Sequence, residues 1–504
     1  MASGINKRIA IGAGWTVAIQ WVDRAIGLLS IAILARLLLP EDFGFVGYAM
    51  VVLAILDQFF QFSFETILIR DQDQTKSKYH TVWTLEILKG VLLALLIVLG
   101  ADLVAGFFRE PDLSVILYWF AAIPLVRGLK NIGTVDFQKE LDFHKEFILN
   151  VSVQLAGSVL TVVLAFLLRS YWALVYGALL RTLLLVALSY ILCGFRPKFS
   201  LSESSAVLGF STWLLVQNVF SSINARLPVI AIGRFFDAQA LAFFNMGKEL
   251  TGMASQEFAA PIRRALYPGI AKMQGDRSQI ASTMTMALGT ITLLALPAIA
   301  GVGVTAPLLI PAFLGENWAG VAPVVQVLSL NAALYVFYPN SHVVYYALDR
   351  PRITACISIL RLFLLAPTVL LIVPEHGVIG AAWAMLAVNG FVMVLDYFIL
   401  LRMTDMTFAG ILATVWRSTL AVAVMVFIVS LVIQNPPAAV FQESTVLQLA
   451  LCIATGVLIY TLAVSTLWGI SGAPEGAEAY VFRVLKKLYN RSAAKWIQET
   501  RMTQ

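Results

Sequence analysis

The residues with the chemistry of a binding site are basic side chains set within long apolar runs. The deep ones are Arg24, Arg226, Lys248 and Arg361, and Arg127 and Arg181 are weaker candidates. A charge at the centre of a membrane helix costs about 2.5–3.5 kcal/mol, so such residues face a partner or a water-filled cavity. Guanidinium groups bind phosphate through paired hydrogen bonds. Together these side chains predict a cationic cavity that binds an anion.

Uncharged polar residues precede one of these arginines. They are Asn218, Ser221 and Ser222. Such residues either line a cavity or hold neighbouring helices together, and the nearby Arg226 favours a cavity. Two carboxylates near the middle of apolar runs, Asp57 and Glu249, have two interpretations of equal weight. Each either takes up an ion such as a proton or is the counter-ion of an arginine.

The composition is that of a membrane protein. Of 504 residues, 60% are hydrophobic and only 13% are charged, whereas a soluble domain has about 25% charged residues. The net charge of +6 does not indicate nucleic-acid binding, because Lys and Arg collect in the cytoplasmic loops of membrane proteins.

Apolar runs of roughly 20–25 residues match the thickness of the bilayer core. Because lipid offers the backbone no hydrogen-bond partners, such runs form helices. The sequence therefore predicts an all-α integral membrane protein with about 14 transmembrane helices. We place them near 12–37, 43–68, 80–105, 113–136, 146–168, 171–194, 207–233, 238–262, 283–307, 319–345, 353–374, 377–401, 412–433 and 446–468.

The basic residues between the runs predict the orientation. With the N-terminus in the cytoplasm, 22 lie inside and only Arg109, Arg169 and Arg234 lie outside. This asymmetry predicts an even number of spans with both termini cytoplasmic. The first apolar run is expected to be an uncleaved helix, since no small-residue cleavage site follows it.

The two halves of the chain share a weak repeat. The spacing from Trp15 to Arg36 is the same as the spacing from Trp213 to Arg234. We predict an N-terminal lobe of six spans (1–200), a C-terminal lobe of six spans (201–405), two further spans (406–470) and a cytoplasmic amphipathic tail (471–504). Parallel repeats of this kind build transporters with a central site.

Motifs for catalysis or metal binding are not found. The three cysteines and four histidines have no ligand or disulfide spacing, so we expect no metal and no cofactor. A membrane enzyme, such as a polysaccharide polymerase, a ligase or a glycosyltransferase, is an alternative. It would be expected to have a long outer loop carrying catalytic groups, and the outer loops here are short.

Two stretches resemble a known family. They are Ala35-Arg36-Leu37-Leu38-Leu39-Pro40-Glu41-Asp42-Phe43-Gly44 and Asp23-Arg24-Ala25-Ile26-Gly27. The first resembles the polysaccharide transporter family, which contains Wzx-type flippases. This family belongs to the multidrug/oligosaccharidyl-lipid/polysaccharide superfamily. The second resembles an element of the lipid II flippase and implies that Arg24 contacts a diphosphate.

The resemblance implies a fold and a function. The fold is two lobes in a V shape around a central cavity. The function is to flip oligosaccharide units on undecaprenyl diphosphate across the bacterial inner membrane by alternating access, for exopolysaccharide, capsule or O-antigen synthesis. Membrane lipid, a polymerase or export machinery, and a coupling proton or sodium ion are the implied partners. A multidrug exporter on the same fold is the alternative, which the buried basic residues oppose.

Overall fold

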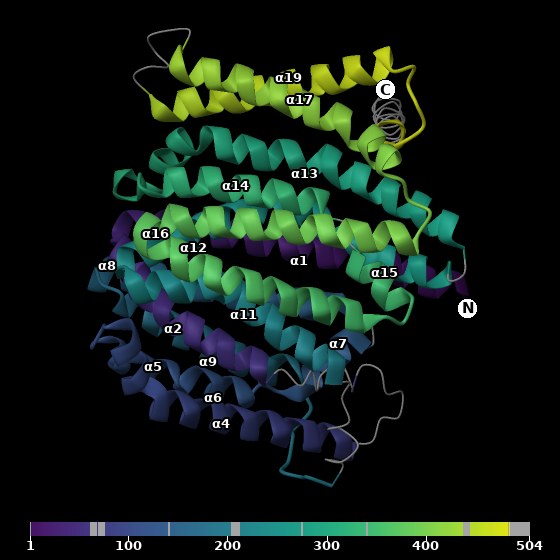
Figure 1. Ribbon diagram of the computed structural model, residues 1–504. Coiled ribbons are helices and arrows are strands. Elements are labelled where there is room, and N and C mark those ends of the chain that lie inside the picture. The colour runs from purple at the N-terminus through teal and green to yellow at the C-terminus, as the bar shows by residue number, and fades with distance from the viewer. Residues whose placement is uncertain are drawn as a thin grey trace, which may run out of the picture. The chain divides into compact units, whose positions relative to one another are not determined.

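The computed structural model describes residues 2–60, 68, 76–139, 142–202, 212–273, 276–338, 341–436, 444–481 and 483. Every regular element in these ranges is a helix (Figure 1). The chain is thus an all-α membrane protein, as the apolar runs predict. Its described helices belong to two compact units.

The first unit contains residues Met1–Asn245 and Phe313–Trp318. Its helices are α1 (Ala2–Leu37), α2 (Pro40–Phe59), α4 (Lys76–Phe108), α5 (Leu113–Phe120), α6 (Ala122–Gly128), α7 (Val135–Lys139), α8 (Phe143–Leu168), α9 (Trp172–Leu192) and α11 (Thr212–Phe235). The segment made of α5 and α6 is bent by 64° relative to the segment that ends with α7. The bend follows α6 directly, so the last turn of α6 lies next to a break in the helical backbone.

The second unit contains residues Met246–Ala312 and Ala319–Gln504. Its helices are α13 (Arg277–Leu314), α14 (Val321–Phe337), α15 (Ser341–Ala347), α16 (Pro351–Met403), α17 (Phe408–Gln434) and α19 (Thr445–Ile470). Helix α12 (Ala238–Lys272) runs unbroken through the boundary between the units. The predicted lobes divide instead at residue 200, and that division stays a prediction.

Ten described helices are long and apolar enough to cross a membrane, and the bent pair would make eleven. Helix α16 has non-helical backbone angles at Gly377 (φ 59°), so its 53 residues form two stretches. They coincide with the predicted runs 353–374 and 377–401. The count of fourteen crossings stays a prediction.

The stretch 35–44, which carries the family resemblance, lies where α1 ends and α2 begins. Asp42 lies in the first turn of α2, and one of its carboxylate oxygens accepts a hydrogen bond from Leu39 N at 2.9 Å. The other oxygen accepts from Tyr171 N at 2.8 Å, at the start of α9. A single carboxylate therefore caps α2 and ties it to α9, because the first N–H groups of a helix lack partners within it.

The same stretch makes two close contacts with distant segments. Trp318 is fully buried, and its indole Nε1 donates to Ala35 O at 2.9 Å. A Cβ atom on Gly44 would lie 1.8 Å from the carbonyl oxygen of Ala238. Only glycine allows the backbones of α2 and α12 to approach this closely. These residues of the stretch therefore position helices against one another.

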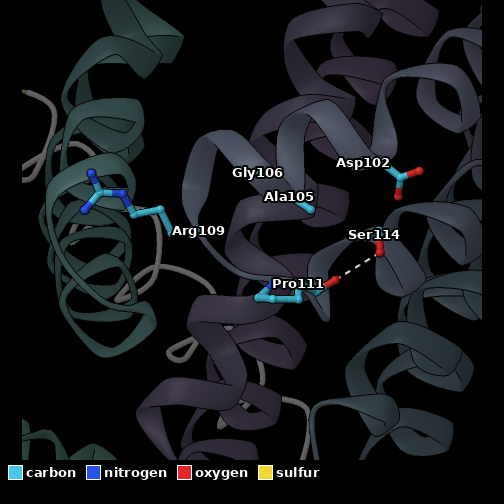
Figure 2. A pocket seen from close by; sticks show the side chains of 6 residues that line it. All are labelled: Asp102, Ala105, Gly106, Arg109, Pro111 and Ser114. Carbon is cyan, nitrogen blue, oxygen red and sulfur yellow. Dashed lines mark hydrogen bonds between the residues drawn. The ribbon is translucent and has the colours of Figure 1, made fainter.

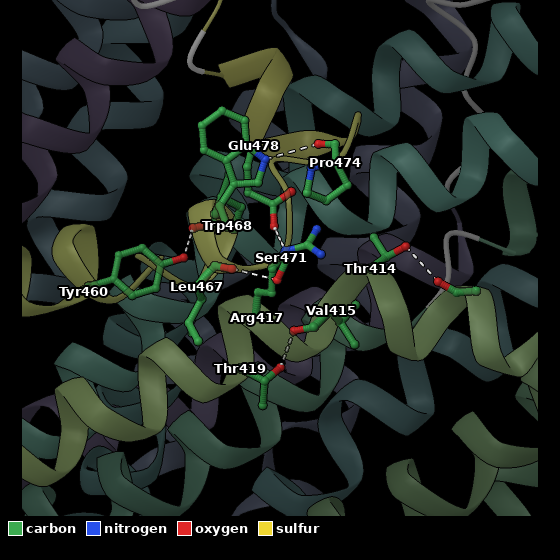
Figure 3. Close-up of polar contacts among 12 residues, drawn as sticks. Thr414, Val415, Arg417, Thr419, Tyr460, Leu467, Trp468, Ser471, Pro474 and Glu478 are labelled. Carbon is green, nitrogen blue, oxygen red and sulfur yellow. Dashed lines mark hydrogen bonds and ion pairs between the residues drawn. The ribbon is translucent and has the colours of Figure 1, made fainter. Parts of the chain in front are cut away.

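A buried ion pair holds the chain after α19 against α17 (Figure 3). Arg417 Nε donates to Glu478 Oε1 at 2.7 Å, and the two side chains are 9% and 7% exposed. Nearby, Tyr460 OH donates to Leu293 O at 2.6 Å and joins α19 to α13. Most of the predicted amphipathic tail lies outside the described residues.

Candidate functional site

In the first unit, three charged side chains predicted from the sequence lie together. Arg127 comes from the last turn of α6, and its Nη1 atom lies 2.8 Å from Asp57 Oδ2 near the end of α2. Arg226 on α11 is within electrostatic range of the same carboxylate. Arg127 and Asp57 are both partly exposed, so the pair is open to solvent or to a ligand.

Counted over the described residues, this cluster has more positive than negative charge. Asp57 forms an ion pair with Arg127, and the buried Nε atom of Arg226 has no hydrogen-bond partner in the described part of the chain. A buried donor left unpaired costs free energy that an acceptor from a ligand would recover. The arrangement therefore favours an anionic ligand at Arg226.

The second unit holds Arg361 in a similar state. Its Nη2 atom donates to the Tyr338 hydroxyl at 3.2 Å, and its guanidinium lies 5.6 Å from the centre of the Tyr338 ring. The Nε atom is buried and lacks a partner among the described residues. Arg226 and Arg361 thus share one feature, a guanidinium group whose Nε atom is buried and has no partner among the described residues.

The other predicted basic residues have different surroundings. Arg24 is partly exposed on α1, and Lys248 is exposed on α12 beside Glu249. All three interact with other groups of the chain. The aliphatic stem of Arg181 on α9 packs on α8, where a Cβ atom on Gly157 would lie 2.9 Å from Arg181 Cγ. Arg181 as a whole remains exposed.

The predicted polar residues of α11 fall in different environments. Ser221 is exposed and Ser222 is buried, and the side chain of Asn218 lies outside the described residues. Asp57 forms the ion pair that its counter-ion interpretation requires. Its role in ion coupling, and that of Glu249, stay predictions.

The structure brings together Arg127, Arg226 and Asp57 in one unit and places Arg361 in the other. A single cavity containing all the predicted residues stays a prediction. The sequence analysis missed Tyr338, whose hydroxyl accepts a hydrogen bond from Arg361. The available signal was Pro339 in the sequence, a helix breaker next to Tyr338 within the predicted run 319–345.

A cavity of about 350 Å³ lies at the turn between α4 and α5, and none of these arginines lines it (Figure 2). Asp102 lines it and accepts a hydrogen bond from Tyr118 OH at 3.2 Å. Arg109 has left-handed backbone angles (φ 60°), and its side chain points away from Asp102. Partial burial raises the pKa of the adjacent Glu110. The exposed Asp102 carboxylate makes this cavity unsuited to a phosphate.

Comparison with known proteins begins with the sequence. Residues 33–323 match the profile of a family described as "Polysaccharide biosynthesis protein". Lipopolysaccharide biosynthesis protein WzxC of Escherichia coli (strain K12) is 24% identical over 410 residues, which cover 79% of this chain and 82% of WzxC. Teichuronic acid biosynthesis protein TuaB of Bacillus subtilis (strain 168) is 23% identical over 472 residues, which cover 90% and 95% of the two chains.

Solved structures share the fold. The lipid II flippase MurJ in an inward closed conformation has a TM-score of 0.71 and 15% identity, over 90% of this chain and 98% of MurJ. A multidrug resistance MATE family transporter in an inward-facing conformation has a TM-score of 0.58 and 13% identity, over 75% and 94% of the two chains. At these identities the similarity concerns the fold alone.

Proposed function

Because this chain belongs to the polysaccharide biosynthesis protein family, we propose that it flips undecaprenyl-diphosphate-linked oligosaccharide units. Movement is from the cytoplasmic to the periplasmic leaflet of the bacterial inner membrane. Relatives named for lipopolysaccharide and teichuronic acid synthesis support a carbohydrate substrate. The fold shared with a lipid II flippase supports a lipid-linked one.

One observation carries the proposal. Arg226 and Arg361 each present a guanidinium group whose buried Nε atom has no partner in the described part of the chain. A diphosphate offers several charged oxygens, and a guanidinium binds such oxygens in pairs. Arg127 adds a third cation once the diphosphate competes with Asp57. Arg24, Lys248 and Arg181 are the further proposed contacts, with Asn218, Ser221 and Ser222 facing the glycan.

The proposed mechanism is alternating access between two lobes with both termini in the cytoplasm. Polar sugars and a diphosphate do not cross hydrocarbon unaided, because each unpaired polar group costs several kcal/mol there. A cationic cavity replaces water around the head group while the lipid tail stays in the bilayer. Asp57 and Glu249 are the proposed ion-coupling carboxylates. The proposed role involves no bond making or breaking, so no catalytic residue is assigned.

The test is transport of a polyprenyl-diphosphate-linked glycan in proteoliposomes. We expect Arg226→Ala and Arg361→Ala each to reduce the flipping rate about tenfold or more, since a hydrogen bond to a charged group contributes about 1.5–3 kcal/mol. Lysine at either position should restore part of the rate, because it keeps the charge and loses the paired geometry.

The matched control is Arg350→Ala, which removes an exposed arginine before α16. It should leave the rate unchanged. Wild-type rates in both Arg226→Ala and Arg361→Ala would contradict the proposal. Transport of an organic cation in place of the glycan would support the multidrug exporter alternative.

A further inference from the structure

A hydrogen-bonded polar cluster surrounds Asp396 inside the second unit. Asp396 lies in the second stretch of α16 and is only 1% exposed. Its two carboxylate oxygens accept hydrogen bonds from Ser341 Oγ and from Tyr345 OH, the latter at 2.8 Å. Both donors belong to α15, the short helix that follows α14. The groups that donate hydrogen bonds to this buried carboxylate are thus both hydroxyls.

The fold of α16 brings this carboxylate to the level of Arg361. Arg361 lies before the break at Gly377 and Asp396 lies after it. The two residues are separated from the break by nearly the same length of helix. With a rise of about 1.5 Å per residue, both positions lie roughly 25 Å from the break. The two stretches fold back on each other (Figure 1), and the Arg361 guanidinium acts electrostatically on Asp396.

Tyr338 connects the two charges. Its hydroxyl accepts a hydrogen bond from Arg361 Nη2 at 3.2 Å, and it lies near enough to Asp396 to interact with the charge of that carboxylate. A hydroxyl donates one hydrogen bond while it accepts others. The Tyr338 hydroxyl is therefore able to relay a change of charge at Asp396 to the guanidinium group.

Hydroxyl partners suit a carboxylate that changes its protonation state. When the carboxylate takes up a proton, a hydroxyl that had donated to it can turn and accept a hydrogen bond from the new O–H group. A guanidinium cannot do this, because it is only a donor. Asp396 therefore keeps its hydrogen bonds in either state, unlike Asp57, which pairs with Arg127. Among the described residues, the titratable groups that act on Asp396 or are acted on by it are Arg361, Tyr338, Tyr345 and Tyr397. One turn further along, the buried Leu400 belongs to an apolar cluster.

We propose that Asp396 is a proton-accepting carboxylate whose charge positions Arg361 through the Tyr338 hydroxyl. The ionised carboxylate holds the guanidinium on Tyr338. The protonated form releases it, and its Nε–H donor then binds the anionic substrate. Because linkage is reciprocal, binding of the diphosphate takes up a proton at Asp396. This inference rests on the proposed function and adds its dependence on protons.

The experiment measures protons exchanged on binding. The probe is a polyprenyl-diphosphate-linked N-acetylglucosamine, a diester without the monoester ionisation near about pH 6. It is titrated into the full chain in nanodiscs, by calorimetry in buffers of different ionisation enthalpy. We expect the wild type to take up a proton and its affinity to fall about fivefold or more as the pH rises.

Two variants separate the carboxylate from the relay. Asp396→Asn should bind without proton uptake, with an affinity that no longer changes with pH and equals that of the wild type at low pH. Tyr338→Phe should remove most of the pH dependence of the affinity while keeping the carboxyl group. Glu478→Gln is the matched control, because it changes another buried carboxylate of the same unit and should keep the wild-type proton uptake.

The outcomes are distinguishable. Wild-type proton uptake in Asp396→Asn would overturn the assignment of the carboxylate, and a wild-type pH profile in Tyr338→Phe would overturn the relay. If the wild-type protein does not bind the diester at any pH, the proposed function itself fails.

Discussion

The arginines of this protein differ in how fully their hydrogen bonds are used. Arg417 is paired with a buried glutamate and serves structure. Arg127 is paired with a partly exposed aspartate, so its charge is available once that aspartate is displaced. Arg226 and Arg361 each have an unused buried donor among the described residues. All four arginines lie within apolar runs, but their hydrogen-bond partners distinguish them as candidates for binding the substrate.

Asp57 pairs with Arg127, so an anionic ligand that binds Arg127 has to compete with this carboxylate. We therefore expect Asp57→Asn to bind the lipid diphosphate more tightly, by several-fold, because the ligand no longer competes with an internal carboxylate. The expected loss of stability is small, about 1 kcal/mol or less, since the pair is partly exposed. The measurement is the dissociation constant of the diester at two salt concentrations.

Asp102→Asn is the control for this change, because it removes an exposed carboxylate of the same unit that lines a different cavity. It should leave the affinity unchanged. Weaker binding by Asp57→Asn would mean that the carboxylate orients the arginines for the ligand, and the competition model would be wrong.

Sequence alone identified Arg226 and Arg361 because a charge within an apolar run is conspicuous. It identified Asp57 and Arg127 separately but not as partners, since they are 70 positions apart in the sequence. Tyr338 was not identified because a tyrosine in an apolar run is ordinary. Pairing in space depends on how the helices fold back, and apolar periodicity does not encode it.

At the scale of elements, long helices were predictable and their interruptions were less so. An apolar run forms a helix because its backbone finds no other partners in lipid. The break at Gly377 coincides with a predicted boundary, whereas the division between α14 and α15 lies within a single predicted run. Helix α12 also continues to Lys272, beyond the predicted run 238–262. Packing between helices decides these details.

The junction of α2 with α12 gives a prediction at this scale. We expect Gly44→Ala to destabilise the protein by about 1–3 kcal/mol, the usual range for overpacking. The new Cβ atom would lie 1.8 Å from a backbone oxygen of Ala238, and a backbone atom does not move aside as a side chain does. The measurement is the thermal unfolding midpoint in detergent.

Gly100→Ala is a matched control within α4, because nothing lies within 4 Å of the new Cβ atom. It should leave the midpoint unchanged or raise it slightly, since alanine favours a helix. An equal midpoint for Gly44→Ala and wild type would show that α2 and α12 separate readily at this point.

At the scale of the whole molecule, the distribution of charge predicts its direction in the membrane. The turn between α4 and α5 carries Arg109 as its one basic residue, and the loop between α16 and α17 follows Arg402. With positive residues retained in the cytoplasm, the first turn faces outward and the second loop faces inward. An even number of spans then returns the C-terminus to the side of the N-terminus.

Labelling of single cysteines in intact cells tests this direction. In a Cys356→Ser background, which removes the exposed native cysteine, Asp112→Cys should react with a membrane-impermeant maleimide from outside. Asp405→Cys should react only after the cells are permeabilised. Both aspartates are exposed residues between helices, so they match each other in accessibility. The reverse pattern would invert the orientation, and the proposed direction of substrate movement would then have to be reversed with it.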